Sequence, residues 1–317
     1  MSNIFFEILR PGTNTTVQDS GRNNLSHIGV TVSGAMDQRN YKISNALVSN
    51  SIDNAVIEFA YQGPLLKLKN GSINFAITGD VNFNIIKNNN EVQKGECYQN
   101  YILNNEDQID IISTQKSVYG YLAVEGSFNV EKIWNSYSIN TKANIGPNNG
   151  KKYSINEKIF VKGSNEKFNK EKKINYKKSL NNIIRVMKGP HFNYFSDMSK
   201  FIFFNEEYSV TNLSDRMGMR LKGPNLENLI NTNIKSEGLV KGVIQVPADG
   251  NPIILLSDHG TIGGYPKIAN VISADLDKVA QLVPRSNIKF KEVNLVEAEN
   301  SFKDYLTDTN KYLNECN

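Results

Sequence analysis

The chain has 317 residues with a net charge of +4, enough for one large domain or two ordinary ones. The positive excess comes mostly from lysines between Lys151 and Lys178, and no nucleic-acid-binding motif of interleaved basic and aromatic residues accompanies them. We therefore expect a solvated surface there and no nucleic-acid partner. No apolar run approaches the roughly 20 residues that a membrane-spanning helix needs, so we expect no membrane segment.

The chain has two cysteines, Cys97 and Cys316, and its N-terminal residues lack the basic-then-apolar pattern of a targeting segment. Two cysteines without a secretion signal are typical of reduced thiols in the cytosol. We therefore expect a soluble, cytoplasmic protein.

Short strands separated by Gly, Asn and Asp turns dominate the first half. They are expected at 3–9, 55–60, 65–68, 73–78, 82–86, 108–113 and 119–124. One helix is expected over 38–49, with Asp37 as its N-cap. Regularly spaced short strands with few helices are typical of a β-barrel or sandwich. Glu58 lies inside the expected strand 55–60, where we expect its carboxylate to face solvent.

A polar stretch at 15–22 follows the first strand and is dense in side-chain donors and acceptors. One interpretation is an ordered loop held by its own Asp, Ser and Thr side chains. The other is one wall of a ligand site, with Gln18, Asp19 and Arg22 pointing at the ligand. The sequence leaves both open.

A charged, Asn-rich and weakly periodic stretch separates the two halves. We predict an N-terminal domain at 1–165, a linker at 166–182 and a C-terminal domain at 183–317. In the second half, strands are expected at 183–187, 208–210, 242–246, 252–256 and 288–293. Helices are expected at 192–203, 274–283 and 296–313.

The apolar runs 242–246 and 252–256 flank Pro-Ala-Asp-Gly-Asn, which predicts a hairpin. Its second strand leads into Asp258, His259 and Thr261 and a glycine-rich turn ending at Gly264. A rigid β scaffold that carries polar groups to one rim is a common setting for binding and catalysis.

Several sequence motifs are absent. There is no Walker A sequence, no GxGxxG after a strand, no zinc-ligand spacing of His and Cys, and no biotin-acceptor lysine in an Ala-Met-Lys-Met setting. We expect no metal site and no biotin attached to this chain. ATP- or biotin-dependent chemistry would need parts from other subunits.

Six segments, in this order along nearly the whole chain, resemble the biotin-dependent carboxyltransferase-like family, also known as the allophanate hydrolase subunit 2 family. They are TTVQDSGR, GVTVSGAMD (which contains Ser33 and Asp37), YGYLAVEG, SDRMGMRL (which contains Ser214 and Asp215), EGLVKGVIQVPADGNPIILLSDHGTIGGYPK and IANVISADLDKVAQLVP. Within the family the resemblance is greatest to the group of C-type 5-oxoprolinase subunits. His259 and Ile262 stand where the family usually has Arg and Thr, and Asn140 and Lys142 where it often has Asp and Arg.

The resemblance implies a mostly β fold of two tandem cyclophilin-like β-barrel domains with a few peripheral helices. It implies one subunit of an enzyme that opens 5-oxo-L-proline to L-glutamate with ATP, active only with partners that are similar to the B-type and A-type subunits of 5-oxoprolinase. Whether this chain binds ATP itself stays open. Two alternatives also stand: a carboxyltransferase acting on urea or a similar small amide with a separate biotin carrier, and a regulatory protein that antagonises a sensor-kinase inhibitor similar to the B-type subunit.

Such substrates are amides or lactams that bear a carboxylate or a urea-like group, and they need an anion clamp, an acid or base and oxyanion donors. Asp258 is the expected acid or base, with Lys267 as its charge partner, and Arg216 and Arg22 are the expected clamps. The turn 260–264 is expected to form a nest of backbone N–H groups. The remaining expected substrate-binding residues are Gln18, Asp19, Ser33, Asp37, Ser214, Asp215, Glu237, Gln245, Thr261, Gly263, Gly264 and Tyr265. Alternatively, Asp215 pairs with Arg216 across a turn, Asp258 caps a turn, and the Gly263–Gly264 pair serves only backbone geometry.

Overall fold

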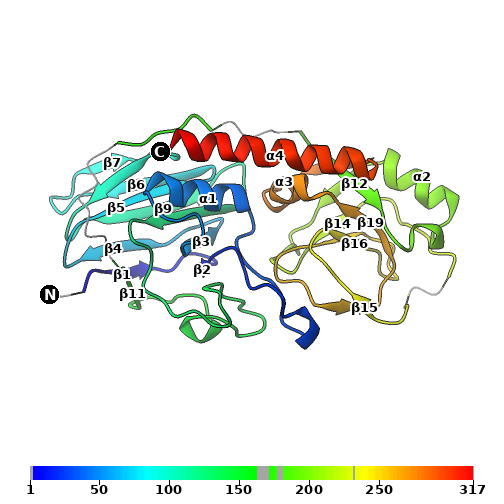
Figure 1. Cartoon of the computed structure of the whole chain (residues 1–317), viewed down its shortest axis with the longest axis horizontal. Coiled ribbons are helices and arrows are strands. Elements are labelled where there is room, and N and C mark those ends of the chain that lie inside the picture. Colours follow the sequence, from blue (N-terminus) through cyan, green and yellow to red (C-terminus); the bar gives the residue numbers. More distant parts are fainter. Residues whose placement is uncertain (1–2, 163–170, 177–180, 231–232, 317) are drawn as a thin grey trace. The chain divides into compact units, whose positions relative to one another are not determined.

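The computed structural model describes residues 3–162, 171–176, 181–230 and 233–316. These form two compact units (Figure 1). Unit 1 comprises Met1–Arg22, Ser33–Lys177 and Thr309–Asn317, and unit 2 comprises Asn23–Val32 and Lys178–Asp308. The domain boundaries expected from the sequence are continuous, whereas each unit takes a short segment from elsewhere in the chain. The expected linker, 166–182, lies partly outside the described residues.

Unit 1 is built from two antiparallel sheets. The strands of the first lie in the order β11 (Lys158–Phe160), β1 (Phe5–Arg10), β4 (Leu65–Lys69), β9 (Gln108–Thr114), β6 (Val81–Ile86) and β7 (Val92–Lys94). Those of the second lie in the order β2 (Thr16–Gln18), β3 (Val56–Ala60), β10 (Tyr119–Val124), β5 (Ile73–Thr78) and β8 (Asn100–Leu103).

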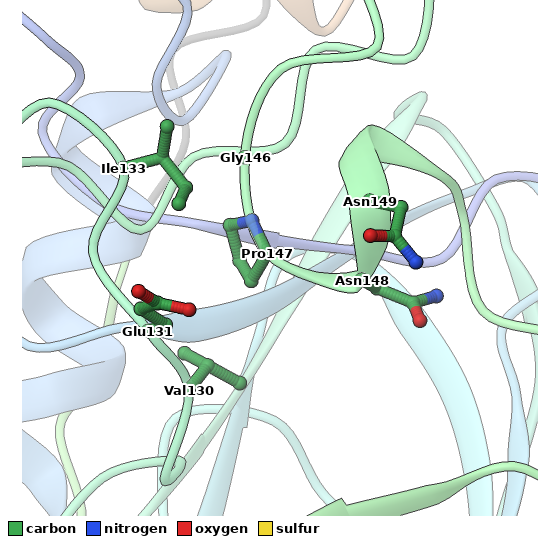
Figure 2. Close-up of a pocket in the computed structure, with 7 residues that line it drawn as sticks. All are labelled: Val130, Glu131, Ile133, Gly146, Pro147, Asn148 and Asn149. Carbon is green, nitrogen blue, oxygen red and sulfur yellow. The ribbon is translucent and has the colours of Figure 1, made fainter.

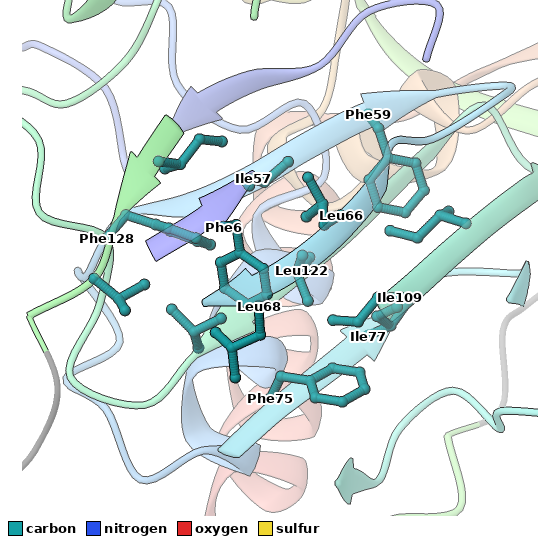
Figure 3. Close-up of a cluster of buried hydrophobic side chains, with 14 of the residues drawn as sticks. Phe6, Ile57, Phe59, Leu66, Leu68, Phe75, Ile77, Ile109, Leu122 and Phe128 are labelled. Atoms are coloured by element: carbon teal, nitrogen blue, oxygen red, sulfur yellow. The ribbon is translucent and has the colours of Figure 1, made fainter. Parts of the chain in front are cut away.

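Side chains from both sheets of unit 1 meet in one hydrophobic core (Figure 3). Strand β1 alternates, so Phe6 and Ile8 enter the core while their neighbours stay partly exposed. Phe59 and Phe75 join them from the second sheet, and both are fully buried. Each such side chain stabilises the fold by about 1.5–3 kcal/mol relative to an exposed one.

Helix α1 (Gln38–Leu47) packs on β5 and β10 of the second sheet. Its N-cap is Asp37, as predicted, because the carboxylate accepts a hydrogen bond from Asn40 N at 3.0 Å. Asp37 therefore fixes the start of α1, directly after the segment that contains Ser33.

Unit 2 contains a closed barrel of seven strands. Their order is β12 (Ile183–Lys188), β19 (Lys267–Val271), β16 (Val243–Gln245), β17 (Ile253–Leu255), β14 (Gly218–Lys222), β13 (Tyr208–Val210) and β20 (Asn287–Glu292). The parallel pairing of β12 with β20 closes the ring. The predicted hairpin is confirmed as β16 and β17, which pair antiparallel. The prediction of a mostly β protein is confirmed as well.

Beside the barrel, β15 (Glu237–Gly238) and β18 (Ile262–Gly263) form a separate two-stranded sheet. The part of the chain that the structure describes also contains the 3₁₀ turns η1 (Ser26–Ile28), η2 (Asn148–Gly150), η3 (Phe192–Tyr194) and η4 (Ser273–Asp275).

The helices of unit 2 are shorter or more divided than the sequence suggests. The single helix expected at 192–203 is wrong: it is η3 followed by α2 (Asp197–Asn205), because Ser196 caps a new helix by accepting from Ser199 N. The helix expected at 274–283 is η4 followed by α3 (Leu276–Ala280).

The last helix, α4 (Leu295–Glu315), begins at a capping box. Asn294 and Glu297 each accept the other's backbone N–H. The helix lies close to the predicted range. Among the described residues, no helix is long and apolar enough to cross a membrane.

Replacing Phe75 with Ala should lower the free energy of unfolding by about 3–5 kcal/mol, because a fully buried ring leaves a cavity in the core of unit 1. The matched control is Ile102→Ala on the neighbouring strand β8, where the side chain is 52% exposed. Urea denaturation measures both. Equal losses in the two variants would contradict this description of the core.

Both cysteine thiols should react slowly in the folded chain. Burial raises the pKa of Cys97 to about 11 and that of Cys316 to about 11, from an ordinary value of 9.0. Since the thiolate is the reactive form, alkylation at pH 8 should run roughly 100-fold slower than in the urea-unfolded chain. Equal alkylation rates before and after unfolding would show that the thiols are not buried.

Candidate functional site

Asp19 organises the polar loop of unit 1. Its Oδ1 accepts from Gly21 N at 2.8 Å, Ser136 Oγ at 2.7 Å and Ser138 Oγ at 2.5 Å, and its Oδ2 accepts from Tyr137 N at 2.7 Å. Both carboxylate oxygens are thus held by the protein, and the side chain is buried. Asp19 is thus a structural residue, as the first interpretation has it, but three of its four donors lie at 136–138 and one lies within the loop itself.

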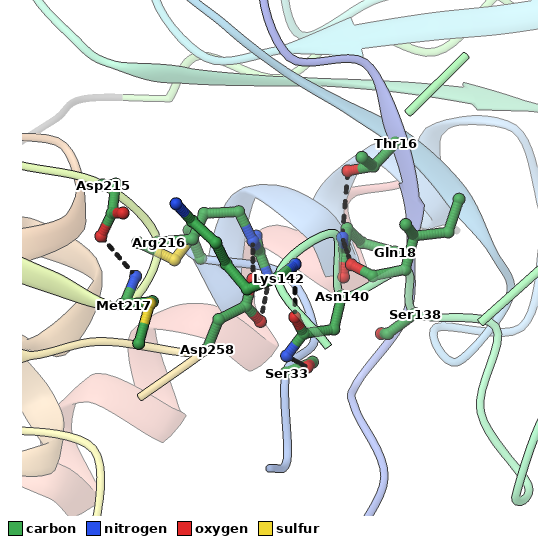
Figure 4. Close-up of polar contacts among 12 residues, drawn as sticks. Thr16, Gln18, Ser33, Ser138, Asn140, Lys142, Asp215, Arg216, Met217 and Asp258 are labelled. Carbon is green, nitrogen blue, oxygen red and sulfur yellow. Dashed lines mark hydrogen bonds and ion pairs between the residues drawn. The ribbon is translucent and has the colours of Figure 1, made fainter. Parts of the chain in front are cut away.

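Gln18 and Arg22 are also buried and also bind the segment that contains Ser138; Figure 4 shows Gln18 beside Ser138. Gln18 Nε2 donates to Thr16 Oγ1 at 3.0 Å and to the carbonyl of Ile139 at 2.8 Å, and Arg22 donates to the carbonyl of Ser138. The guanidinium that we expected to clamp an anion thus binds backbone. Both side chains therefore hold the loop against the segment of Ser138 and Ile139.

Ser33 meets Asn140 in the same unit. Asn140 Nδ2 donates to Ser33 Oγ at 3.2 Å, and Asn140 Oδ1 accepts from the backbone N–H groups of Lys142 and Ala143. The backbone of Ser33 is left-handed, with φ 57°. The structure therefore joins two segments that lie 107 residues apart in the sequence.

The expectation that Glu58 faces solvent is wrong. The residue is fully buried in β3, and its Oε2 accepts from Met36 N at 2.8 Å. Its register partner on β10, Tyr121, accepts from Asp37 N at 2.8 Å. All five residues of β3 are buried, so the face opposite the core is covered as well. The signal in the sequence was a carboxylate within an uninterrupted apolar run rather than an alternating one.

Arg216 and Asp258 form a buried bidentate pair in unit 2 (Figure 4). Arg216 Nε lies 2.7 Å from Asp258 Oδ2, and Nη2 lies 3.1 Å from Oδ1. Asp258 N also donates to the carbonyl of Arg216 at 2.8 Å. The two residues meet because β14 and β17, which flank them in sequence, are paired. Arg216 therefore holds the predicted acid or base.

Ser214 and Asp215 shape the turn before β14. Asp215 Oδ1 accepts from Met217 N at 2.9 Å and Gly218 N at 3.2 Å, and Ser214 Oγ accepts from Arg220 N at 3.1 Å. These bonds fix the backbone from which the Arg216 side chain extends.

The expected pairing of Lys267 with Asp258 is wrong, because Lys267 pairs with Glu237. Its Nζ lies 2.5 Å from Glu237 Oε2, and His191 Nε2 lies 3.7 Å from the same oxygen. Lys267 lowers the pKa of Glu237, and burial lowers the pKa of His191. His191 was not among the predicted site residues. Its only signal was its position directly after the Gly-Pro that follows a strand.

The turn 260–264 is not an anion-binding nest. A nest needs left-handed residues, and none of Gly260, Gly263 and Gly264 has a positive φ. Instead β18 pairs with β15. A Cβ on Gly263 would lie 2.7 Å from Leu239 Cδ1 and 2.9 Å from Gln245 Nε2, so glycine permits close packing here. The close approach of these two side chains, and not an unusual backbone conformation, explains glycine at position 263.

The other predicted residues of this region surround that turn. Gln245 is buried and donates to the carbonyl of Tyr265 at 3.4 Å, while Thr261 accepts from Leu239 N through its backbone carbonyl. Tyr265 is 40% exposed. His259 is buried, which lowers its pKa, and its Nδ1 contacts the carbonyl of Gly260 at 2.6 Å.

A pocket of about 280 Å³ in unit 1 was not predicted (Figure 2). It is lined by Val130, Glu131, Ile133, Gly146, Pro147, Asn148 and Asn149. Asn148 and Asn149 are left-handed, so the chain makes a tight turn at this side of the pocket.

Most of the sequence matches one family model. Residues 28–292 match the model of the carboxyltransferase domain, subdomain A and B. The chain belongs to this carboxyltransferase family. It is 32% identical to the C-type 5-oxoprolinase subunit of Haemophilus influenzae over 92% of each chain, and 30% identical to that of Escherichia coli over 94% of each.

The structure also resembles that of the urea amidolyase of K. lactis, with a TM-score of 0.88 and 24% identity. The match covers 98% of this chain and 20% of that one. At this identity the match supports the fold and nothing more. Among the residues described here, no group of three or more His, Cys, Asp and Glu side chains is placed to hold a metal ion.

Asp19→Asn should lower the free energy of unfolding by about 2–3 kcal/mol, since the amide cannot accept all four hydrogen bonds that the buried carboxylate accepts. Asp53→Asn, at an exposed position, is the control and should change it by less than about 0.5 kcal/mol. Thermal and urea unfolding measure the difference. If Asp19→Asn leaves the free energy of unfolding unchanged, Asp19 does not order the loop.

Proposed function

We propose that the chain is one subunit of an ATP-dependent 5-oxoprolinase complex, which opens 5-oxo-L-proline to L-glutamate. The observation that carries this proposal is the match to two proteins named as C-type 5-oxoprolinase subunits. Each match extends over more than nine-tenths of this chain and of the relative. Such a name implies further subunits. We propose proteins similar to the B-type and A-type subunits of 5-oxoprolinase as the partners, and the cytoplasm as the location of the complex.

The chemistry adds water across an amide bond: the carbonyl carbon gains oxygen, the C–N bond breaks and the nitrogen takes up a proton. Asp258 is the group in unit 2 that we assign to proton transfer. Arg216 orients its carboxylate through two charge-assisted hydrogen bonds. This revises the role expected from the sequence, because Arg216 serves Asp258 rather than clamping an anion by itself.

ATP belongs to the proposed reaction of the complex, where its hydrolysis drives the opening of an unreactive lactam. The sequence of this chain has no Walker A motif. We therefore assign nucleotide binding to the assembled complex, and we propose that biotin is not attached to this chain.

A second candidate is carboxyl transfer to urea or a similar small amide, with biotin on a separate carrier. The description of the matched family as a carboxyltransferase domain favours it. The two reactions differ in product: glutamate from 5-oxoproline in one case, and a carboxylated amide that requires carboxybiotin in the other.

The test is ATP-dependent release of glutamate from 5-oxo-L-proline by the chain combined with both partner proteins. Asp258→Asn and Arg216→Lys should each lower kcat by about 10²–10⁴, because proton transfer loses its group or its orientation. Arg220→Ala, at an exposed position of β14, is the control and should keep full activity.

Unfolding of each variant is measured alongside, so that a folding defect is separated from a catalytic one. Wild-type turnover in a folded Asp258→Asn complex would refute the assignment. Biotin-dependent carboxylation of urea without any glutamate release would favour the second candidate.

A further inference from the structure

Lys267 is a buried ammonium group. It is the first residue of β19, and its side chain is only 7% exposed. An ammonium carries three N–H donors, and a buried cation needs acceptors to offset its lost hydration. Within the described ranges, the acceptor that Lys267 Nζ has is Glu237 Oε2, at 2.5 Å. One carboxylate oxygen therefore accepts from a cation whose three N–H groups could donate to further acceptors.

His191 aims a second donor at the same oxygen. Its Nδ1 accepts from Lys267 N at 3.2 Å, so the proton of the neutral ring sits on Nε2. Burial lowers the pKa of His191, which keeps the ring neutral at pH 7. The Nε2 atom lies 3.7 Å from Glu237 Oε2. A neutral N–H and an ammonium thus converge on one carboxylate.

The carboxylate itself comes from an exposed element. Glu237 belongs to the two-residue strand β15, both of whose residues are exposed, and its side chain is 47% exposed, whereas His191 and Lys267 are more than nine-tenths buried. The two donors are fixed parts of the barrel region. Glu237 reaches them from outside, so it is the member of the cluster that can leave without disturbing the core.

We propose that Lys267 and His191 form a site for the carboxylate of a small ligand, and that Glu237 occupies this site in the unliganded chain. This inference rests on the proposed function and deepens it, because 5-oxo-L-proline carries one carboxylate. A single buried ammonium beside one neutral donor matches a monoanion, whereas a phosphate dianion needs more positive charge.

Gln245 adds a donor suited to an amide. It lies opposite Lys267 in the pairing of β16 with β19, and it is buried. Its Nε2 makes a long hydrogen bond, 3.4 Å, to the carbonyl of Tyr265. A ligand that bears both a carboxylate and an amide carbonyl would exchange this weak bond for a better one.

If Glu237 competes with the ligand, removing its charge should strengthen binding. We expect Glu237→Gln to lower the Kd for 5-oxo-L-proline and for acetate at least 10-fold relative to wild type, measured by calorimetry on the full-length chain. Lys267→Met should abolish binding of both in the Glu237→Gln background. Glu206→Gln, at an exposed position of the same unit, is the control and should leave both Kd values unchanged.

Two further arms keep the test decisive. Pyrrolidin-2-one, which has the lactam without the carboxylate, should gain nothing from Glu237→Gln, and Lys267→Arg should retain carboxylate binding if Lys267→Met fails to fold. The proposal is overturned if Glu237→Gln binds carboxylates no better than wild type, or if a folded Lys267→Met double variant still binds them. Tighter acetate binding by Glu237→Gln, together with no glutamate release by the wild-type chain combined with both partner proteins, would refute the proposed function and keep the carboxylate site.

Discussion

Burial of ionised side chains is the constraint that shapes both units of this protein. A carboxylate or guanidinium taken out of water costs several kcal/mol unless the chain supplies partners. In unit 2 the pairing of β14 with β17 brings Arg216 beside Asp258, and two hydrogen bonds offset the cost for both groups. The strand register of the barrel therefore fixes the position of the group that we assign to proton transfer.

In unit 1, neutral hydrogen-bond donors stabilise the buried carboxylates. Asp19 is held by two serine hydroxyls and two backbone N–H groups, and Glu58 accepts the backbone N–H of Met36. Both carboxylates tie loops to the framework of the unit. Such bonds resist local opening, because releasing the loop would leave a charge buried without partners. Internal hydrogen bonds hold the loops around Ser33 and Ser138 in place.

Local signals in the sequence predicted the local structure well. The apolar runs around Pro-Ala-Asp-Gly-Asn predicted the hairpin of β16 and β17, and Asp37 marked the start of α1, since hairpin turns and N-caps depend on neighbouring residues. The partners of charged groups could not be predicted in this way. Lys267 pairs with Glu237, thirty residues away, only because β15 and β18 bring the two segments together.

Burial was the other quantity that the sequence left open. Glu58 looked like the solvent-facing member of a strand, but the residues before α1 cover that face of the sheet. The glycines of the turn 260–264 suggested a nest, whereas the close approach of Leu239 and Gln245 explains Gly263. In each case a tertiary contact decided between two interpretations that are equal at the level of residue type.

We propose that the buried charges of unit 2 hold and activate a small amide that bears a carboxylate. The sharpest test is a crystal structure of the chain soaked with 5-oxo-L-proline. We expect the ligand carboxylate on Lys267 Nζ and His191 Nε2, with the Glu237 side chain displaced. Ligand bound elsewhere, for instance in the pocket beside Pro147, with the Lys267–Glu237 pair intact, would contradict it.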